Sequence, residues 1–401
     1  MHEGLRHYLT VTGGYWAFTI TDGAIRMLVV LYFYKLGYSP LEIAMLFLFY
    51  EFFGIVTNLV GGWLGARIGL NLTMHIGMIL QIGALLMLTV PSAWLSVAYV
   101  MTVQALSGIA KDLNKMSAKA GVKLFVPEGG DAKLFRWVAV LTGSKNALKG
   151  AGFFVGAALL AYTGFRGALF VLAAMLAGAL LVTWILLPGE MGKMGSKAKF
   201  SQIFSTNPKV NRLSAARFFL FGARDVWFVV GLPVFLYAKL GWNFTEVGAF
   251  FALWVIGYGF VQAAAPSLLK RLTNTHPDGR TAALWAFGLV TVPALMAIGI
   301  SRGWETQTLI IGGLSLFGIV FAINSAIHSY LVVAWSKQEQ VSMNVGFYYM
   351  ANAGGRLAGT VLSGWVYQTA GLAGCLWWSA VFLLAAAIIS TRLSVQTKVT
   401  T

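Results

Sequence analysis

The stretch KLGYSPLEIA, residues 35–44, returns later in the chain as KLGWNFTEVG, residues 239–248. Lys, Leu, Gly and Glu occupy the same places in both stretches, and a tyrosine in the first faces a tryptophan in the second. The offset of 204 residues also pairs Arg67 with Arg271. Matches in the same order in a chain of 401 residues predict two halves built on one plan.

A second pair of stretches supports the duplication. KGAGFFVGAALLAYTG, which starts at Lys149, aligns at an offset of 207 with RLAGTVLSGWVYQTAG, which starts at Arg356. Gly152 then faces Gly359. Each match is short, and it is their common order that predicts a repeated unit.

The composition is that of a membrane protein. Hydrophobic residues make up 58% of the chain, charged residues 10%, and the mean hydropathy is +0.75. A water-soluble domain that exposed so much apolar surface would aggregate. The single cysteine, Cys375, excludes an internal disulfide. The N-terminal MHEGLRHYLT lacks the pattern of a cleaved signal, so we expect the first apolar run to be retained.

Apolar runs of about 20 residues, enough to cross a bilayer, recur along the chain. We predict an all-α membrane protein with twelve transmembrane helices in two pseudo-symmetric six-helix bundles. The expected spans are 15–36, 41–65, 70–90, 93–114, 134–162, 165–188, 213–238, 245–269, 281–301, 305–334, 341–368 and 371–391. The expected domains are 1–188 and 213–401, with a cytoplasmic linker at 189–212.

The net charge of +16 is typical of nucleic-acid-binding proteins, but its distribution favours a membrane. Most lysines and arginines outside the spans fall in the termini and the connections after even-numbered spans. The positive-inside rule explains this asymmetry, and it places both termini in the cytoplasm. We therefore expect the protein to lie in a lipid bilayer and not to bind nucleic acid.

Charged residues inside the predicted spans are the candidate site, because such residues are costly and face a partner or a cavity. The cations are Arg26, Lys145, Lys149, Arg217, Arg224 and Arg356, and the anions are Asp22, Glu51 and Asp225. The surplus of cations favours a small anionic organic substrate, whose oxygens suit the planar fork of arginine.

Several of these residues have a plain structural alternative. Asp22 and Arg26 are one helical turn apart and are expected to pair, either as a scaffold or around a substrate. Lys145 and Lys149 lie either in a cavity or at the cytoplasmic edge of their span. Arg217, near the start of its span, is expected to extend toward lipid headgroups.

Neighbouring positions add further candidates. Arg224 and Asp225 are adjacent and are not expected to share a helix face, so at least one should pair with another helix. Arg356 follows two glycines in mid-span and is expected in the cavity, with Asn352 as a possible donor to substrate. Glu51 has no local partner and, with Asp22 and Asp225, is a candidate proton carrier.

His328 either titrates or is a packed hydrogen-bonding residue.

KDLNKMSAKAGVK, residues 111–123, repeats lysine every fourth residue at Lys111, Lys115 and Lys119. We expect a cytoplasmic helix end against anionic lipid, with an electrostatic entrance for an anion as the alternative.

The loop after the second span resembles the signature of the major facilitator superfamily. In GGWLGARIGLN, the residues that fit are Gly61, Gly62, Gly65, Arg67 and Gly69. Ala66 stands where the family has an aspartate that helps to hold the outward-facing state, so the usual gating contact is altered. The resemblance implies the two-bundle fold, with a substrate site between the halves.

A narrower resemblance rests on YWAFTITDGAIRMLVVLYFY, LFLFYEFFGIVTNLVGGWLGARIGLNLTM and ALSGIAKDLNKMSAKAGVKL. These stretches look like the organoarsenical efflux permeases of bacterial arsenic-resistance operons. The resemblance implies export of 1-arseno-3-phosphoglycerate across the bacterial inner membrane, paired with a glyceraldehyde-3-phosphate dehydrogenase that makes it.

Other functions remain open at the level of sequence. Another facilitator for organic phosphates, a proton-coupled drug exporter, and a polytopic membrane enzyme or sensor are the alternatives. A Walker loop, an HExxH motif and a nucleophile constellation are all lacking in the sequence. We therefore expect a monomeric, secondary transporter without cofactor or metal.

Overall fold

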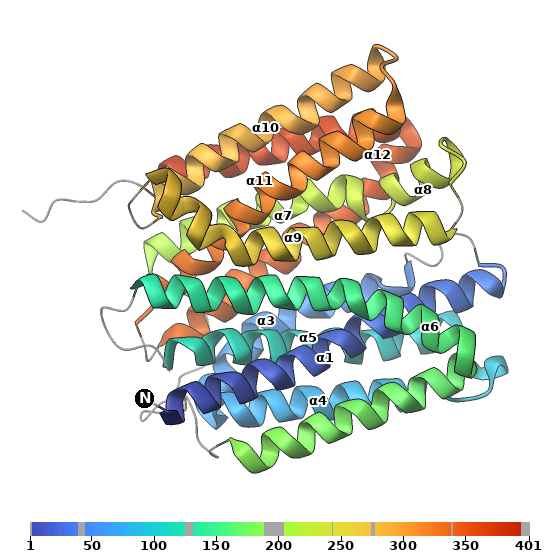
Figure 1. The fold of residues 1–401 in the computed structure, drawn as a ribbon, viewed down its shortest axis with the longest axis vertical. Coiled ribbons are helices and arrows are strands. Elements are labelled where there is room, and N and C mark those ends of the chain that lie inside the picture. Colours follow the sequence, from blue (N-terminus) through green and yellow to red (C-terminus); the bar gives the residue numbers. More distant parts are fainter. Residues whose placement is uncertain are drawn as a thin grey trace, which may run out of the picture.

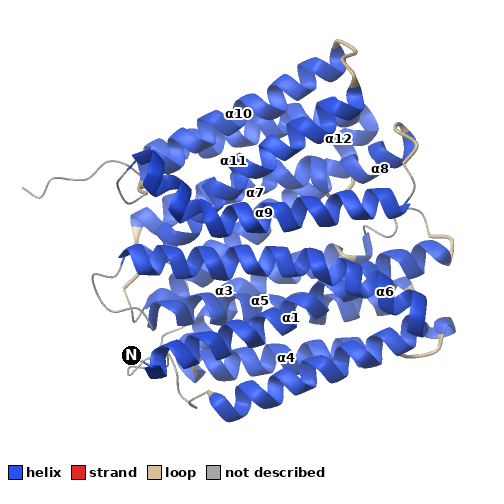
Figure 2. Ribbon diagram, in the orientation of Figure 1, coloured by secondary structure: helices blue, strands red, loops and turns tan. Residues whose placement is uncertain are grey.

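The computed structural model describes residues 2–38, 45–124, 131–187, 204–242, 244–273, 277–337 and 340–393. In these ranges the regular elements are helices, joined by short loops (Figures 1 and 2). The helices are α1 (His2–Lys35), α3 (Leu48–Ile68), α4 (Leu70–Met87), α5 (Val97–Leu124), α6 (Asp131–Leu186), α7 (Pro208–Phe228), α8 (Gly231–Ala238), α9 (Phe244–Thr273), α10 (Gly279–Ser301), α11 (Thr306–Ala334) and α12 (Val341–Thr391). A short 3-10 turn, η1, covers Ser92–Trp94.

Two of these helices each contain two rods. The backbone leaves helical geometry at Gly164 in α6, with φ +69°, and at Gly371 in α12, with φ +63°. Positive φ is cheap only for glycine, so the sequence allows the chain to reverse there. The two glycines are 207 residues apart, the offset of the second repeat. With α7 and α8 forming one crossing, the described helices make the predicted twelve passes.

Seven helical stretches of the described chain are long and apolar enough to cross a membrane by length and composition. They do not include α1, α3, α5 or the first rod of α6, which carry Asp22, Glu51, Lys111 and Lys145. Charged residues at these positions are tolerated only where the helix faces other protein or a cavity, because exposing them to lipid costs free energy. The first half of the chain therefore keeps its charges toward the centre of the bundle.

The packing of the helices repeats from one half to the other. α1 packs on α6 as α7 packs on α12, and α4 packs on α5 as α10 packs on α11. The halves meet through α3 with α12 and through α6 with α9. Figure 1 shows α6 and α9 running side by side. These two contacts are equivalent under the repeat, so the sequence duplication is a duplication of structure.

Glycines allow the halves to approach closely at both contacts. A Cβ on Gly346 of α12 would lie 2.5 Å from the carbonyl oxygen of Asn58 and 2.9 Å from Cα of Gly62 on α3. Gly143 of α6 and Gly259 of α9 meet in the same way. Small residues permit such backbone contact in membranes, so these crossings fix how the halves fit together.

Substituting Gly346→Ala is expected to push α12 away from α3 and to destabilise this arrangement by about 1–3 kcal/mol, as overpacking does. Gly288→Ala, on α10, is the control because nothing lies within 4 Å of its Cβ position. Thermal unfolding of the purified protein measures the difference. Equal midpoints for the two variants would show that the close crossing is not needed.

The buried apolar core shows which end of the bundle is closed. Near the N-terminus one cluster joins both halves, including Tyr8, Leu134, Leu269, Val341 and Leu393. At the opposite end each half has a cluster of its own, one around Phe33 and Leu88, the other around Leu236 and Leu372. The halves are therefore sealed together at the end that holds the N-terminus.

Some predicted boundaries shift. α5 continues to Leu124, ten residues past the expected end of its span, and α7 begins at Pro208, before the expected start at 213. Residues 39–44 of the first repeat and residues 189–203, most of the predicted linker, lie outside the described residues. The domain boundaries stay a prediction.

Candidate functional site

A cavity of about 320 Å³ lies between the two halves. Its walls come from α1, α5 and α6 of the first half and from α7, α9, α11 and α12 of the second. Nine basic residues line it: Arg26, Lys111, Lys115, Lys119, Lys145, Lys149, Arg217, Arg224 and Arg356. Among the described lining residues the one acidic side chain is Asp225. The wall of the cavity is therefore strongly cationic.

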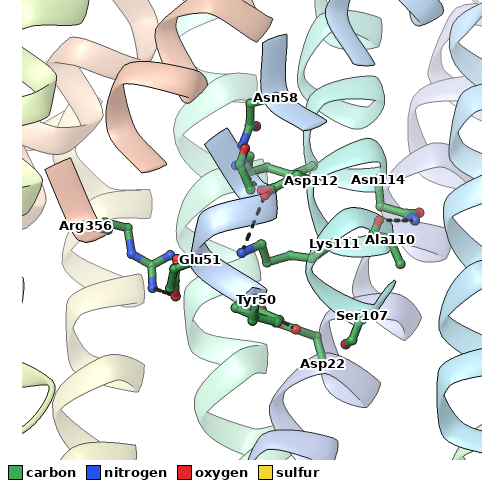
Figure 3. A network of polar contacts seen from close by, with 12 residues as sticks. Asp22, Tyr50, Glu51, Asn58, Ser107, Ala110, Lys111, Asp112, Asn114 and Arg356 are labelled. Carbon is green, nitrogen blue, oxygen red and sulfur yellow. Dashed lines mark hydrogen bonds and ion pairs between the residues drawn. The ribbon is translucent and has the colours of Figure 1, made fainter. Parts of the chain in front are cut away.

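A chain of alternating charges crosses from one half to the other. Arg356 donates from Nη2 to Oε1 of Glu51, at 2.5 Å, and from Nε to Oδ2 of Asp225, at 3.0 Å. Arg224 pairs with the other oxygen of Asp225 at 2.5 Å, and Arg26 lies 4.0 Å from Glu51. Figure 3 shows Arg356 reaching Glu51 across the gap between α12 and α3. Arg356 thus links the halves at the cavity.

Asp22 does not pair with Arg26, and that expectation was wrong. Its carboxylate accepts hydrogen bonds from Lys149, at 2.7 Å, and from the hydroxyl of Tyr50, at 2.6 Å. α6 comes close enough to α1 because Gly23 packs against Gly152 and the carbonyl of Lys149. An amine from the neighbouring helix therefore reaches the carboxylate in place of the guanidinium one turn away.

The Asp22–Lys149 pair has a counterpart in the second half. Lys149 and Arg356 are aligned by the repeat, and Arg356 bonds to Asp225 of α7 as Lys149 bonds to Asp22 of α1. Asp22 and Asp225 are 203 residues apart, close to the first offset. Each half thus ties its first helix to its fifth by one buried ion pair beside the cavity.

The lysines of α5 face the cavity, so the expectation of a lipid-facing helix end was wrong. Lys115 pairs with Asp112 at 2.5 Å, and Lys111 lies 3.6 Å from the same carboxylate (Figure 3 shows the latter pair). Lys119 is buried and donates to the hydroxyl of Tyr349 at 2.9 Å. Their four-residue spacing puts all three on one face of α5, and that face lines the cavity.

Three of the cavity cations have no carboxylate oxygen within 4 Å in the described part of the chain: Lys119, Lys145 and Arg217. Lys119 interacts electrostatically with both of the others. Arg217 is only 3% exposed, so its expected extension toward lipid headgroups was wrong. Like charges buried together repel, and a bound anion would relieve that repulsion.

Arg217 is held by neutral groups. Its Nε donates to Asn352 Oδ1 at 2.9 Å and its Nη1 to Ser325 Oγ at 3.0 Å, while its guanidinium carbon lies 3.7 Å from the ring centre of Phe221. Across the cavity Asn146 donates to Gln262 at 2.6 Å, and Gln262 donates to Ser325 at 3.1 Å. These bonds orient the arginine without cancelling its charge.

The count of buried charges strengthens the expected surplus. Within the described residues, the nine cavity cations lie among four buried carboxylates, those of Asp22, Glu51, Asp112 and Asp225, which leaves a formal excess of five positive charges. Lys145 and Lys149 both line the cavity and do not lie at the cytoplasmic edge of their span, the other position that the sequence left open. In a site of low dielectric this excess attracts an anion strongly.

Arg224 and Asp225 differ in part from expectation. The long arginine side chain folds back, so the adjacent residues pair directly. Asp225 also pairs with Arg356 on α12, as the predicted partner on another helix requires. Arg26 and Arg224 both line the cavity, and the alternating chain of charges connects them.

His328 lies outside the cavity wall. It is 1% exposed, and its Nδ1 has no hydrogen-bond partner within the described chain. In the same described part, no group of three or more His, Cys, Asp and Glu residues has the placement to hold a metal ion. His328 therefore contributes to the packing between α11 and its neighbours.

The signature loop lies at the sealed end. Gly62 and Gly65 pack on the start of α12, where Ser342 Oγ donates to the carbonyl of Gly62 at 2.8 Å. Gly69 has φ +97°, which turns the chain from α3 into α4. Ala66, where the family has aspartate, is buried against Met343. An apolar contact thus occupies the place of the gating charge.

Two other loop residues lie close by. A Cβ on Gly61 would meet the side chain of Leu113 on α5 at 2.9 Å. The guanidinium carbon of Arg67 lies 5.1 Å from the ring centre of Trp63. The predicted loop is therefore helical up to Ile68, since these residues form the last turns of α3, and it packs between α5 and α12 at this end of the bundle.

Comparison with known proteins agrees with this architecture. A search of curated protein sequences gave no match. Among solved structures, the human organic anion transporter MFSD10 (TETRAN) is similar with a TM-score of 0.77 and 17% identity, covering 96% of this chain and 99% of that one. A bacterial homologue of the iron transporter ferroportin in the outward-facing state gives 0.76 and 13%, covering 98% and 100%.

The E. coli fucose:proton symporter FucP gives a TM-score of 0.72 and 12% identity, covering 97% of this chain and 98% of that one. At these identities the likeness shows the fold. The sequence profile of the Major Facilitator Superfamily matches residues 11–330, most of the chain. The protein is therefore a multi-pass membrane transporter, not an enzyme, and it belongs to the Major Facilitator Superfamily.

Proposed function

We propose that this transporter is a secondary carrier for a small organic anion. The observation that carries the proposal is the group of cavity cations without a carboxylate partner among the described residues: the buried Lys119 and Arg217, and the half-buried Lys145. A cationic substrate would add to their repulsion, whereas a phosphate, arsenate or carboxylate would neutralise it. The surplus charge therefore argues against the alternative of a cationic-drug exporter.

Transport by alternating access fits the arrangement of the two halves. With the termini in the cytoplasm, as the loop charges predict, the sealed end faces inward and the cavity belongs to an outward-facing state. The halves then rock around the cavity. Opening the sealed end requires the glycine crossing of α3 on α12 and the bond from Lys119 to Tyr349 to separate.

The proposed proton carriers are Asp22, Glu51 and Asp225, each of which is ion-paired in the structure. A substrate anion that takes Arg356 from Glu51 leaves that carboxylate with Arg26 alone, at 4.0 Å. A proton is the smallest charge that can replace the lost partner. Proton coupling would then be linked to substrate binding through Arg356.

The narrower candidate substrate is 1-arseno-3-phosphoglycerate, exported to give arsenate resistance in a bacterial inner membrane. It rests on the three stretches that look like organoarsenical permeases, and its two anionic ends suit a cavity rich in lysine and arginine. An organic phosphate handled by another facilitator is the second candidate, since the same cations would bind it.

Expression in an arsenate-sensitive bacterium tests the narrow candidate. We expect resistance and lower cellular arsenic when the protein is produced with a glyceraldehyde-3-phosphate dehydrogenase, because that enzyme supplies the ester. Production of the Arg356→Gln variant with the same enzyme is the matched control and should leave cells sensitive. Sensitivity of cells that produce the wild-type protein and the enzyme would rule out this substrate. It would not contradict transport of other organic anions, which the binding measurements on the purified protein test.

A further inference from the structure

The two sides of the cavity differ in chemistry, although the halves share one fold. The first half supplies six of the nine lining cations, on α1, α5 and α6. The second half supplies a wall of aromatic rings from α7 and α9, which we call the aromatic wall: Phe221, Phe228, Phe251, Trp254 and Tyr258. Val229, Pro233 and Val255 extend it with further apolar surface.

Helical spacing brings these rings together. Phe251, Trp254 and Tyr258 lie three, four and seven residues apart on α9, so they share one face, and Phe221 and Phe228 are seven apart on α7. Phe228 is the centre of the wall, 4.7 Å from Phe251 and 5.3 Å from Trp254 between ring centroids. The wall is continuous across the two helices.

The rings are fixed in position before any ligand binds. Trp254 donates from Nε1 to the carbonyl of Leu314 at 2.8 Å, and it stacks on Tyr258 with 11° between the ring planes. Phe221 lies between the guanidinium groups of Arg217 and Arg224, at 3.7 and 4.9 Å. A preorganised apolar surface in a ligand cavity favours a ligand with an apolar body.

From this wall we infer that the substrate is an amphipathic organic anion. Its charged head lies at Lys119, Lys145 and Arg217, and a flat apolar body, best an aromatic ring, lies against Phe228, Phe251 and Trp254. The inference rests on the proposed transport of organic anions and narrows their class. A glycerate ester such as 1-arseno-3-phosphoglycerate suits the lysines and arginines but carries hydroxyl and charged groups along its whole length, and the wall would leave those groups without hydrogen-bond partners. The amphipathic anion and the arsenical are therefore alternative substrates of the same cavity, and the arsenate test and the titration below distinguish them.

The competing role for these rings is a gate at the open end. Met27 of α1 lies 3.9 Å from the Cβ position of Gly248 on α9, so the halves also approach each other beside the wall. Rings that serve only as a gate would not distinguish the bodies of two ligands with the same head. A comparison of matched ligands therefore separates the two roles.

The test is calorimetric titration of the purified protein with phenylphosphonate and with methylphosphonate, which carry the same anionic head. We expect phenylphosphonate to bind at least about tenfold more tightly. In Phe251→Ala the preference should fall to about twofold, with methylphosphonate affinity unchanged. Phe260→Ala, on the same helix but 67% exposed and outside the cavity, is the matched control and should keep the full preference.

Equal binding of both ligands to the wild type would overturn the amphipathic class and leave organic-anion transport standing. Failure of both ligands to bind would overturn the inference together with the proposed function. A preference that survives in Phe251→Ala and in Phe228→Leu would also contradict the inference, because it would place the apolar body elsewhere.

Discussion

Arg356→Gln is expected to abolish transport and to lower the free energy of unfolding by about 3–5 kcal/mol, because Arg356 links the two halves through buried carboxylates. Arg356 is the partner of Glu51 at 2.5 Å and of Asp225 at 3.0 Å. Its loss leaves the buried Glu51 with Arg26 alone, at 4.0 Å. Chemical unfolding in detergent measures the stability, and uptake into proteoliposomes measures transport.

Two further variants identify the cause of that loss. Glu51→Gln combined with Arg356→Gln should recover much of the stability, because the uncompensated carboxylate is gone, but should not recover transport. Arg302→Gln, at an exposed position, is the matched control for removing one arginine. Transport at the wild-type rate by Arg356→Gln would show that the link between the halves is dispensable.

The largest loss of substrate affinity is expected when the lysines that have no carboxylate partner among the described residues are replaced. The double variant Lys119→Met, Lys145→Met should lose about 100-fold in affinity for an organic anion, in line with the cost of removing charge partners from a desolvated site. Its free energy of unfolding should stay level or rise, because the substitutions remove buried like charges. Anion counterflow in proteoliposomes and unfolding in detergent give the two quantities.

Lys115→Met is the matched control, since Lys115 lies on the same face of α5 as Lys119 but pairs with Asp112 at 2.5 Å. We expect the reverse pattern there, with a loss of stability and a smaller loss of affinity. Equal losses of stability in the double variant and in Lys115→Met would show that Lys119 and Lys145 are structural.

The fold was predictable because the sequence contains an internal repeat that corresponds to its two halves. The offset of 207 residues that aligns Lys149 with Arg356 also relates the chain reversals at Gly164 and Gly371. Apolar runs gave the crossings because a bilayer demands length and hydropathy of each span. The end of α5 was missed because a lysine-rich stretch reads as polar surface until the neighbouring helices are known to bury it.

The sequence predicted which charged residues belong to the site, but it did not predict which of them form ion pairs. Charges within apolar runs pointed to Arg356 and Glu51, but these residues are 305 apart in sequence, and only the fold joins them. Asp22 was assigned to Arg26 because sequence shows the neighbour one turn away and hides Lys149 on α6. The aromatic wall gave no signal in the sequence, because 28 phenylalanines and 14 tryptophans are spread along the chain and nothing in their spacing marks the five that meet.

The central claim is that the cavity is an anion site, and one binding measurement tests it most directly. Purified wild-type protein is titrated with phenylphosphonate and with phenyltrimethylammonium, which share a body and differ in the sign of the head. The account predicts saturable binding of the anion at one per chain, weakened by salt, and no binding of the cation. Saturable binding of the cation, without binding of the anion, would contradict it.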